Sequence, residues 1–377
     1  MQCGLKSTKT NLYIPIDILG LNPTNPFTHE LIQALDRQGL DIDYGLFRLA
    51  HSKNKWHIVN FQWPEEIFGW SEPSPNQLLW LENRLIEISK ISRVVITIHN
   101  SAPHYRDTDG FAALYRLVYK YTDAFVHLGQ ASVDILHARY PNECTNKIHR
   151  VIPHGNYNAF GKFVSKNIAH SQLHLPENRQ LVLVVGALRN EEEYVLLADS
   201  LPLWIDEDSG LLLAATVGFK PKLRLRTLHK RLRFEVLMRL QMRWLSRNRN
   251  VFIKPGPIPH DQMAALVCAA DVVLIPRLRG LNSGNVPLGF TYGKVVVGPD
   301  VGVVGQILKD TGNPVFKPED GANGVAEAVK AGLRLAAAGH GKSNKQIAQT
   351  DWDWDNVARQ YRQLYAQLLA KRMLNTD

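Results

Sequence analysis

Short apolar runs alternate with longer helical patterns along most of the chain. The runs at 181–186 (LVLVVG) and 271–276 (DVVLIP) are rich in β-branched residues and apolar at consecutive positions. This is typical of strands buried on both faces of a parallel sheet. Helical stretches such as Phe111–Tyr121 and Asp261–Ala270 supply the crossovers, so the repetition predicts a doubly wound α/β architecture. The predicted strands are Leu12–Leu19, His57–Phe61, Val94–His99, Ala124–Leu128, Ile148–Ile152, Leu181–Gly186, Leu211–Val217, Val251–Ile253, Val272–Ile275 and Val295–Val297.

A polar stretch divides this pattern into two halves. Residues Tyr157–Asn178 are rich in Asn, Ser, His and Lys, show little periodicity, and lie between two series of strands. A chain of 377 residues also exceeds the usual length of one domain. We therefore expect domains at residues 1–168 and 169–350, each with its ligands at the carboxyl ends of its strands.

A loop rich in small and polar residues follows the strand predicted at Val272–Ile275. Its residues Asn282, Ser283, Gly284 and Asn285 lead into a short helix. Small residues let backbone N–H groups approach a ligand, and the amino end of a helix carries partial positive charge. The segment therefore predicts an anion site suited to a diphosphate. An ordinary loop, with Ser283 or Asn285 as the helix N-cap, is the alternative.

Two other strand ends carry side chains that could act on a ligand. Arg189 lies between a strand and a helix, where its guanidinium could hold phosphate oxygens; a surface ion pair with Glu191–Glu193 is the alternative. His99 closes another strand and is a candidate general base, with Asp109 in the following polar segment as second candidate. A structural role is the commoner one for such a histidine. His154 lies at a similar strand end.

Positive charge is concentrated in one segment, Lys220–Arg249. It holds eleven of the 44 Lys and Arg residues and one acid, Glu235, so the rest of the chain is close to neutral although the net charge is +9. Apolar residues recur every four positions, which predicts a helix. The helix could be a solvated face or could lie on anionic lipid, where each base contributes roughly 1 kcal/mol. We expect no nucleic-acid partner, because aromatic residues are few and no recognition motif is present.

Several chemistries are disfavoured by what the chain lacks. P-loop, GxGxxG, GxSxG and HExxH motifs are missing, and the D-x-D sequences at 107–109 and 351–353 are weak candidates for a metal site. Three scattered cysteines are too few for a disulfide framework or a zinc site. The start of the chain is a poor signal peptide, and no apolar run reaches 18 residues. We therefore expect a cytoplasmic protein whose only membrane contact is peripheral, on the inner face.

Six sets of segments, taken in order, carry a family resemblance. They are LNPTNPFTHELIQALDRQG, IVNFQWPEEIFGW, VVITIHNSAPH with KIHRVIPHGNY, VVGALRN, ADVVLIPRLRGLNSGNVPLGFTYGKVVVGPDVG and WDWDNVARQYRQLYAQLL. Together they resemble bacterial glycosyltransferases of the GT-B fold, close to the family-4-like group used in capsule and exopolysaccharide assembly. The resemblance implies two Rossmann-like domains that face each other across a cleft. It also implies that residues 351–377 form a helix that crosses back to the N-terminal domain.

The resemblance implies roles for individual residues. The donor-binding residues would be Arg189, Asn282, Ser283, Gly284, Asn285 and Lys294. The catalytic candidates would be His99 and then Asp109, and the residues facing the acceptor would be Asn22, Asn100 and His154. The substrates would be a nucleotide-diphospho-sugar and a glycan or lipid-linked acceptor. We expect no cofactor and no required metal.

The chain departs from the family pattern in its charges. Gly280 and Leu288 occupy positions where many relatives carry glutamates, and Glu191–Glu193 occupy the stretch where most carry a lysine. Contacts to nucleotide, sugar and phosphate are thereby lost, and the stereochemical course stays open. A sugar-nucleotide epimerase of the same fold and a non-catalytic binding or scaffold protein are therefore the alternatives.

Overall fold

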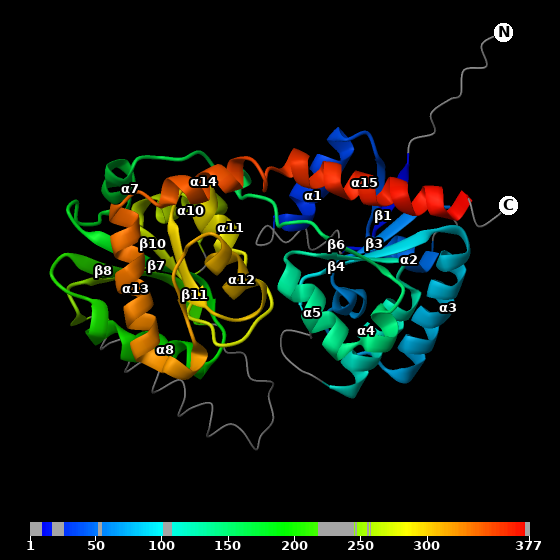
Figure 1. Cartoon of the computed structure of the whole chain (residues 1–377), viewed down its shortest axis with the longest axis horizontal. Coiled ribbons are helices and arrows are strands. Elements are labelled where there is room, and N and C mark those ends of the chain that lie inside the picture. Colours follow the sequence, from blue (N-terminus) through cyan, green and yellow to red (C-terminus); the bar gives the residue numbers. More distant parts are fainter. Residues whose placement is uncertain are drawn as a thin grey trace, which may run out of the picture. The chain divides into compact units, whose positions relative to one another are not determined.

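The computed structural model describes residues 10–16, 26–51, 55–100, 108–217, 245, 247–254, 256 and 258–373 (Figure 1). The chain divides into two compact units. Unit 1 comprises Met1–Gly155 and Thr350–Asp377, and unit 2 comprises Asn156–Gln349. The sequence places the first boundary at residue 168. The structure assigns residues 156–168 to unit 2, where the backbone N–H of Tyr157 donates to the Thr291 hydroxyl at 2.9 Å.

Unit 1 contains a parallel six-stranded sheet in the order β2-β1-β3-β4-β5-β6. Its strands are β1 (Asn11–Ile14), β2 (Asp41–Tyr44), β3 (Ile58–Phe61), β4 (Arg93–Ile98), β5 (Ala124–His127) and β6 (Ile148–Val151). The chain adds β2 on one side of β1 and the remaining strands on the other side. The order of strands therefore reverses between β1 and β3, which are hydrogen-bonded neighbours.

Helices cover both faces of this sheet. They are α1 (Phe27–Arg37), α2 (Leu46–His51), η1 (Pro64–Phe68), α3 (Pro75–Ile91), α4 (Asp109–Tyr121), α5 (Gln130–Arg139), α6 (Pro141–Cys144) and α15 (Trp354–Met373). In Figure 1, α15 runs beside α1, and both pack on one face against alternate strand residues such as Leu12, Val95 and Val126. The intervening strand residues, such as Val94 and Phe125, are also buried and point to the other face, where α3 and α5 contact β4 and β5. The helix expected to cross back, α15, is thus part of the core of unit 1.

Unit 2 contains a second parallel six-stranded sheet, in the order β12-β11-β10-β7-β8-β9. Its strands are β7 (Gln180–Leu188), β8 (Ser209–Val217), β9 (Val251–Ile253), β10 (Val272–Leu274), β11 (Val295–Pro299) and β12 (Val315–Phe316). The strands after β7 are added first on one side and then, from β10 on, on the other. The strand order therefore reverses between β7 and β10.

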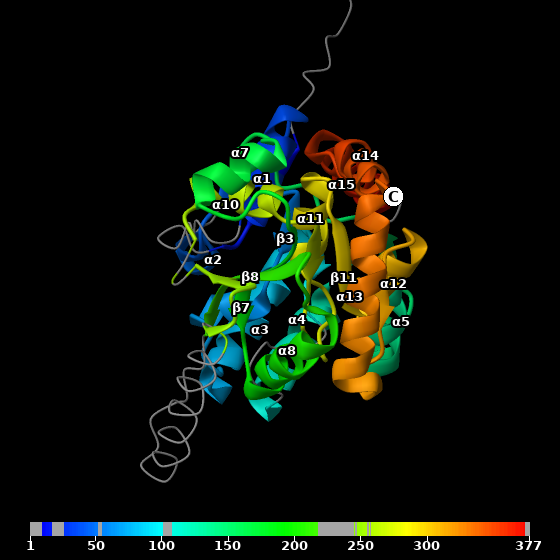
Figure 2. The ribbon, with the colours of Figure 1, turned by 90° about the vertical axis from the view of Figure 1, so that its left-hand side faces the viewer.

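The helices in the described part of unit 2 also form two layers. They are η2 (Asn158–Phe160), α7 (Lys166–Leu173), α8 (Glu191–Trp204), α10 (His260–Ala269), α11 (Asn285–Thr291), α12 (Gly302–Asp310), η4 (Pro318–Asp320), α13 (Gly321–Ala337) and α14 (Gly341–Gln349). Figure 2 shows α13 alongside α8, and their apolar residues share one core with Val182, Leu211 and Val272 of the sheet. On the other side, α7 packs with α10, and α11 packs with α14. The predicted doubly wound α/β architecture is therefore confirmed in both units.

Most of the basic segment Lys220–Arg249 lies outside the described residues. Its predicted helix and its contact with anionic lipid stay predictions. Among the helices that the structure does describe, none combines the length and hydrophobicity that crossing a bilayer requires.

Three histidines of unit 1 lie next to one another beside β5 and β6: His127 is buried, His149 is half-buried and His137 is exposed. Nε2 of His127 lies 2.9 Å from Nδ1 of His149, and the His149 ring lies 4.4 Å from the His137 ring. Burial, reinforced by the two neighbouring histidines, lowers the pKa of His127 from 6.5 to about 3. Burial also lowers the pKa of His149. Both rings therefore stay neutral in the folded protein at pH values where the unfolded chain binds protons.

We expect the free energy of unfolding to fall as the pH drops from about 6.5 toward 5. In this window the unfolded state binds more protons than the folded state, so acid favours unfolding. Each such histidine adds a slope of up to about 1.4 kcal/mol per pH unit. Urea unfolding across this range measures the slope, which should be smaller in a His127→Asn variant. An equal slope in the variant would contradict the assignment.

Candidate functional site

The two donor-binding segments predicted from the sequence meet at one edge of the unit 2 sheet. Arg189 directly follows β7, and the loop Asn282–Asn285 follows β10, the parallel neighbour of β7. The Asn285 side-chain amide donates to the carbonyl of Val185 at 3.0 Å, which ties the loop to β7. This edge is the carboxyl end of the strands at the point where strand order reverses, the usual ligand site of an open α/β sheet.

The loop itself is shaped by a close approach of backbone to side chain. A Cβ atom on Gly284 would lie 2.6 Å from the Tyr157 hydroxyl, so a larger residue would displace one of the two. Gly284 is also the N-cap of α11, and no side chain caps this helix. The Ser283 hydroxyl accepts only the long 3.4 Å hydrogen bond from the Asn285 backbone N–H. The N-cap is therefore Gly284, and not Ser283 or Asn285 as the ordinary-loop alternative suggested.

Glu193 is buried at this edge and connects it to an arginine that the sequence analysis did not single out. One carboxylate oxygen of Glu193 accepts the Arg189 backbone N–H at 2.7 Å, and the other lies 3.8 Å from Nε of Arg277. The side chains of Glu193 and Arg277 are only 6% and 15% exposed. Glu191 and Glu192 are exposed, so the three successive glutamates do not behave alike. Glu193 thus holds a second arginine, Arg277, in the loop after β10.

Lys294 is not brought to this edge. It precedes β11 and therefore lies at the amino end of the strands, whereas Arg189 lies at the carboxyl end. The Lys294 ammonium donates to the carbonyl of Cys268 at 2.8 Å, and burial lowers its pKa. These contacts give Lys294 a structural role. The sequence misplaced it because the spacing of a family motif does not show at which edge of the sheet a residue lies.

The two positions that lack the family's glutamates offer no acidic group here. Gly280 has a backbone φ of +150°, and Leu288 is 4% exposed within α11. Neither position therefore adds a carboxylate to this edge, where Glu193 is the buried acid.

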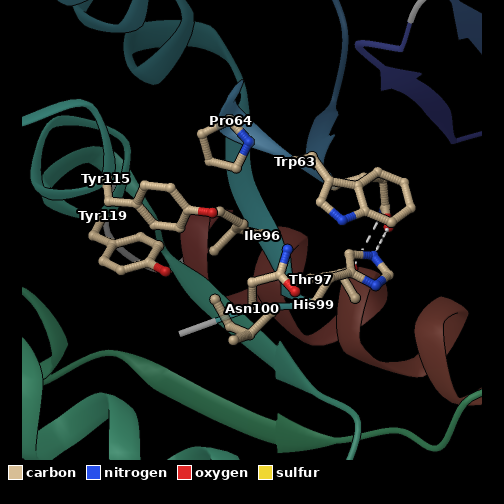
Figure 3. A pocket seen from close by; sticks show the side chains of 10 residues that line it. Trp63, Pro64, Ile96, Thr97, His99, Asn100, Tyr115 and Tyr119 are labelled. Carbon is tan, nitrogen blue, oxygen red and sulfur yellow. Dashed lines mark hydrogen bonds between the residues drawn. The ribbon is translucent and has the colours of Figure 1, made fainter. Parts of the chain in front are cut away.

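His99 lies at the carboxyl edge of the unit 1 sheet, directly after β4 (Figure 3). Its ring stacks on Trp63 at 4.0 Å and meets the edge of Phe27 at 4.8 Å. Its Nε2 atom lies 2.9 Å from Oε1 of Gln62, the residue that follows β3. The Gln62 contact was not anticipated, since nothing in the sequence marks the residue after β3 as a partner of His99.

The remaining candidates of unit 1 have different positions. Asn100 lines the same small recess as His99 (Figure 3), and the His154 ring lies 4.8 Å from the shared neighbour Phe27. Burial lowers the pKa of His154 to about 4. Asp109 is exposed and begins α4, where an acid stabilises the helix dipole. Asn22 lies outside the described residues.

The weak metal candidates find no further support. Asp353 accepts the Asp355 backbone N–H at 3.0 Å, as an acid at a helix start does, and Asp107 lies outside the described residues. Within the described ranges, no three His, Cys, Asp or Glu residues are grouped so that they could hold a metal ion. The expectation that no metal is required stays a prediction.

The sequence matches no protein-family model and no curated protein. The structure, however, is similar over nearly its whole length to solved structures. Sucrose-phosphate synthase of Thermosynechococcus elongatus gives a TM-score of 0.70 at 17% identity, over 96% of this chain and 100% of that chain. A glycosyltransferase of Rickettsia africae gives 0.69 at 13%, over 96% and 99%. The HepE protein of Anabaena, solved with UDP, gives 0.67 at 12%, over 96% and 100%. At such identities the likeness establishes the architecture, and the chain has the two-domain α/β fold of the GT-B class.

Proposed function

We propose that this protein is a glycosyltransferase that moves a sugar from a nucleotide-diphospho-sugar to a glycan or lipid-linked acceptor in polysaccharide biosynthesis. The observation that carries the proposal is the convergence of Arg189, Arg277 and the loop Asn282–Asn285 where strand order reverses in unit 2. Structures of the same fold support it: those of HepE hold UDP or UDP-glucose, and that of Arabidopsis starch synthase IV holds ADP and acarbose.

The chemistry required of this edge is stabilisation of a leaving group. When the sugar departs, negative charge grows on the nucleoside diphosphate. A guanidinium binds phosphate oxygens through several N–H donors in a fixed plane, and backbone N–H groups near Gly284 add neutral donors. Donors held in place before the reaction lower the barrier by several kcal/mol, because they need no reorganisation. In this assignment Arg277 supplies the charge that relatives obtain from the missing lysine.

We assign acceptor binding to unit 1. An acceptor hydroxyl must lose its proton as it attacks the sugar. His99 is the first candidate to accept it if the enzyme inverts, and Asp109 is the second. We further propose that the protein is cytoplasmic and that Lys220–Arg249 contacts the inner membrane surface. Co-sedimentation with anionic but not neutral vesicles at low salt checks this contact, and failure to sediment would remove it.

A panel of nucleotide sugars tests the function, each incubated with and without a lipid extract and a glycan mixture. A transferase releases nucleoside diphosphate faster when acceptor is present. An epimerase converts the donor without an acceptor and releases no diphosphate, and a scaffold protein does neither. Diphosphate release that does not respond to any acceptor, or no turnover at all, would contradict the proposal.

A further inference from the structure

We infer that Gln62 is a positioning residue, which holds His99 with its proton on Nε2 and so makes Nδ1 the nitrogen that accepts a hydrogen bond or proton from a sugar hydroxyl. The inference rests on the proposed function for the identity of the hydroxyl. The position of the proton rests on the structure alone. Figure 3 shows the His99 ring against Trp63. Nε2 of the same ring lies 2.9 Å from Oε1 of Gln62.

The hydrogen bonds of Gln62 determine which of its ends faces His99. Its side-chain nitrogen donates to Oδ1 of Asn60 at 3.2 Å and to the hydroxyl of Thr97 at 3.3 Å. Both N–H groups of the amide are thereby used. Its oxygen, 2.9 Å from Nε2 of His99, can only accept. The proton between them therefore belongs to Nε2.

The hydrogen bonds of this network continue into the C-terminal helix, α15. The Asn60 amide nitrogen donates to the Tyr365 hydroxyl at 2.7 Å, and the Thr97 and Tyr361 hydroxyls lie 3.1 Å apart. Burial raises the pKa of both tyrosines, so each keeps its proton and stays neutral. Among the described residues, the side chains that hydrogen-bond to Gln62 from the side away from His99 are therefore neutral, and they connect the residues after β3 and β4 to α15.

Burial makes this arrangement costly to change. Asn60, Gln62 and Thr97 are at most 1% exposed, and His99 is 8% exposed. A buried donor that loses its acceptor destabilises the folded state, so reversing one amide disfavours the whole network unless every member reverses with it. Trp63 on the face of the His99 ring and Phe27 at its edge also restrict rotation of the ring. Both the orientation of the imidazole and its proton are thus fixed before substrate arrives.

Because residue 62 carries an amide and not a carboxylate, it affects which nitrogen of His99 is protonated without adding charge beside the ring. A carboxylate in the place of Gln62 would favour the doubly protonated, cationic imidazole, in which neither nitrogen can accept a hydrogen bond. A neutral amide oxygen fixes the tautomer and adds no charge. The ring keeps one donor and one acceptor nitrogen, which is what a group that takes the hydrogen of a hydroxyl requires.

Long-range ¹H–¹⁵N NMR of the histidine-labelled full-length protein tests the inference, with His99→Gln used to identify the His99 signals. The expected result is a protonated Nε2 whose hydrogen exchanges slowly with water, and an unprotonated Nδ1. A protonated Nδ1 with an accepting Nε2, which is the signature of the reversed network, would overturn the inference. So would a ring protonated on both nitrogens at neutral pH.

Two variants then distinguish an effect on the position of the His99 ring from a general loss of folding stability. Gln62→Leu should abolish the slow exchange at Nε2 and lower kcat by roughly ten- to a hundredfold, with the KM for the donor nearly unchanged. Ser92→Ala removes a buried 2.7 Å hydrogen bond to Trp56 at the opposite end of β4, and should lower Tm without altering the His99 signals or kcat. Unchanged exchange and kcat in Gln62→Leu would overturn the inference. A protonated Nε2 in a protein that transfers no sugar would instead remove the proposed function and leave the positioning intact.

Discussion

Arg189→Ala should lower the turnover of sugar transfer by about 10²–10³-fold, the cost of removing one preorganised donor from a developing anion. Arg189 directly follows β7 at the reversal of strand order, and Glu193 holds its backbone N–H at 2.7 Å. Because that hydrogen bond uses the main chain, the substitution leaves it in place. The loss should therefore appear in kcat and in the affinity for the nucleoside diphosphate, with Tm nearly unchanged.

Arg279→Ala is the matched control for this charge change. Arg279 lies in the loop after β10, but its side chain is 87% exposed and its ion pair with Glu192 is 3.9 Å long. Exposed pairs of this kind contribute little to stability, so turnover and Tm should both stay close to the original. If the Arg189 variant kept near-normal kcat, or if the Arg279 variant lost as much, the donor site would have to lie elsewhere.

His99→Gln should reduce turnover by about 10²–10⁴-fold, the range for losing a general base, if His99 deprotonates the acceptor. The glutamine retains a polar group of similar length but cannot take up the proton. Because donor binding is assigned to unit 2, the affinity for a nucleoside diphosphate measured by calorimetry should not change. Loss of kcat with unchanged diphosphate affinity is thus the expected combination.

His29→Gln provides the comparison for the histidine substitution. His29 is an exposed residue of α1 whose ring hydrogen-bonds Gln33 within the same helix. The same chemical change there should leave turnover unaltered. Equal effects of the two substitutions, or a loss of diphosphate affinity in His99→Gln, would contradict the assignment of His99 to the acceptor.

The architecture could be predicted because strands buried on both faces leave long apolar runs in the sequence. All ten predicted strands occur, and two more were not recognised. β2 reads Asp-Ile-Asp-Tyr and has no fully buried residue, while β12 has only two residues. At the edge of a sheet a strand need not be apolar, so its sequence carries a weak signal.

From the sequence, residues of the candidate site could be placed together only where each directly follows a predicted strand. Arg189 and the loop Asn282–Asn285 meet this condition, and parallel strands place such ends at the same edge. Their role in donor binding stays a prediction. The partners Glu193 and Arg277, like Gln62 and His99, are far apart in the sequence, and only their spatial contact reveals them. Lys294 is the opposite case. Its spacing in the sequence matches the family's donor-site motif, but its ammonium donates to the backbone carbonyl of Cys268.

The packing of α15 has a consequence for how the protein is made. Val357, Tyr361 and Leu364 complete the core that Leu12 and Ile14 begin, although the whole of unit 2 is translated between them. On the ribosome, one face of the unit 1 sheet therefore stays apolar and uncovered until α15 emerges. The later-synthesised unit 2, contiguous in sequence, can finish folding before the unit that precedes it. A nascent chain stalled before residue 350 should therefore be the species that chaperones bind and proteases degrade.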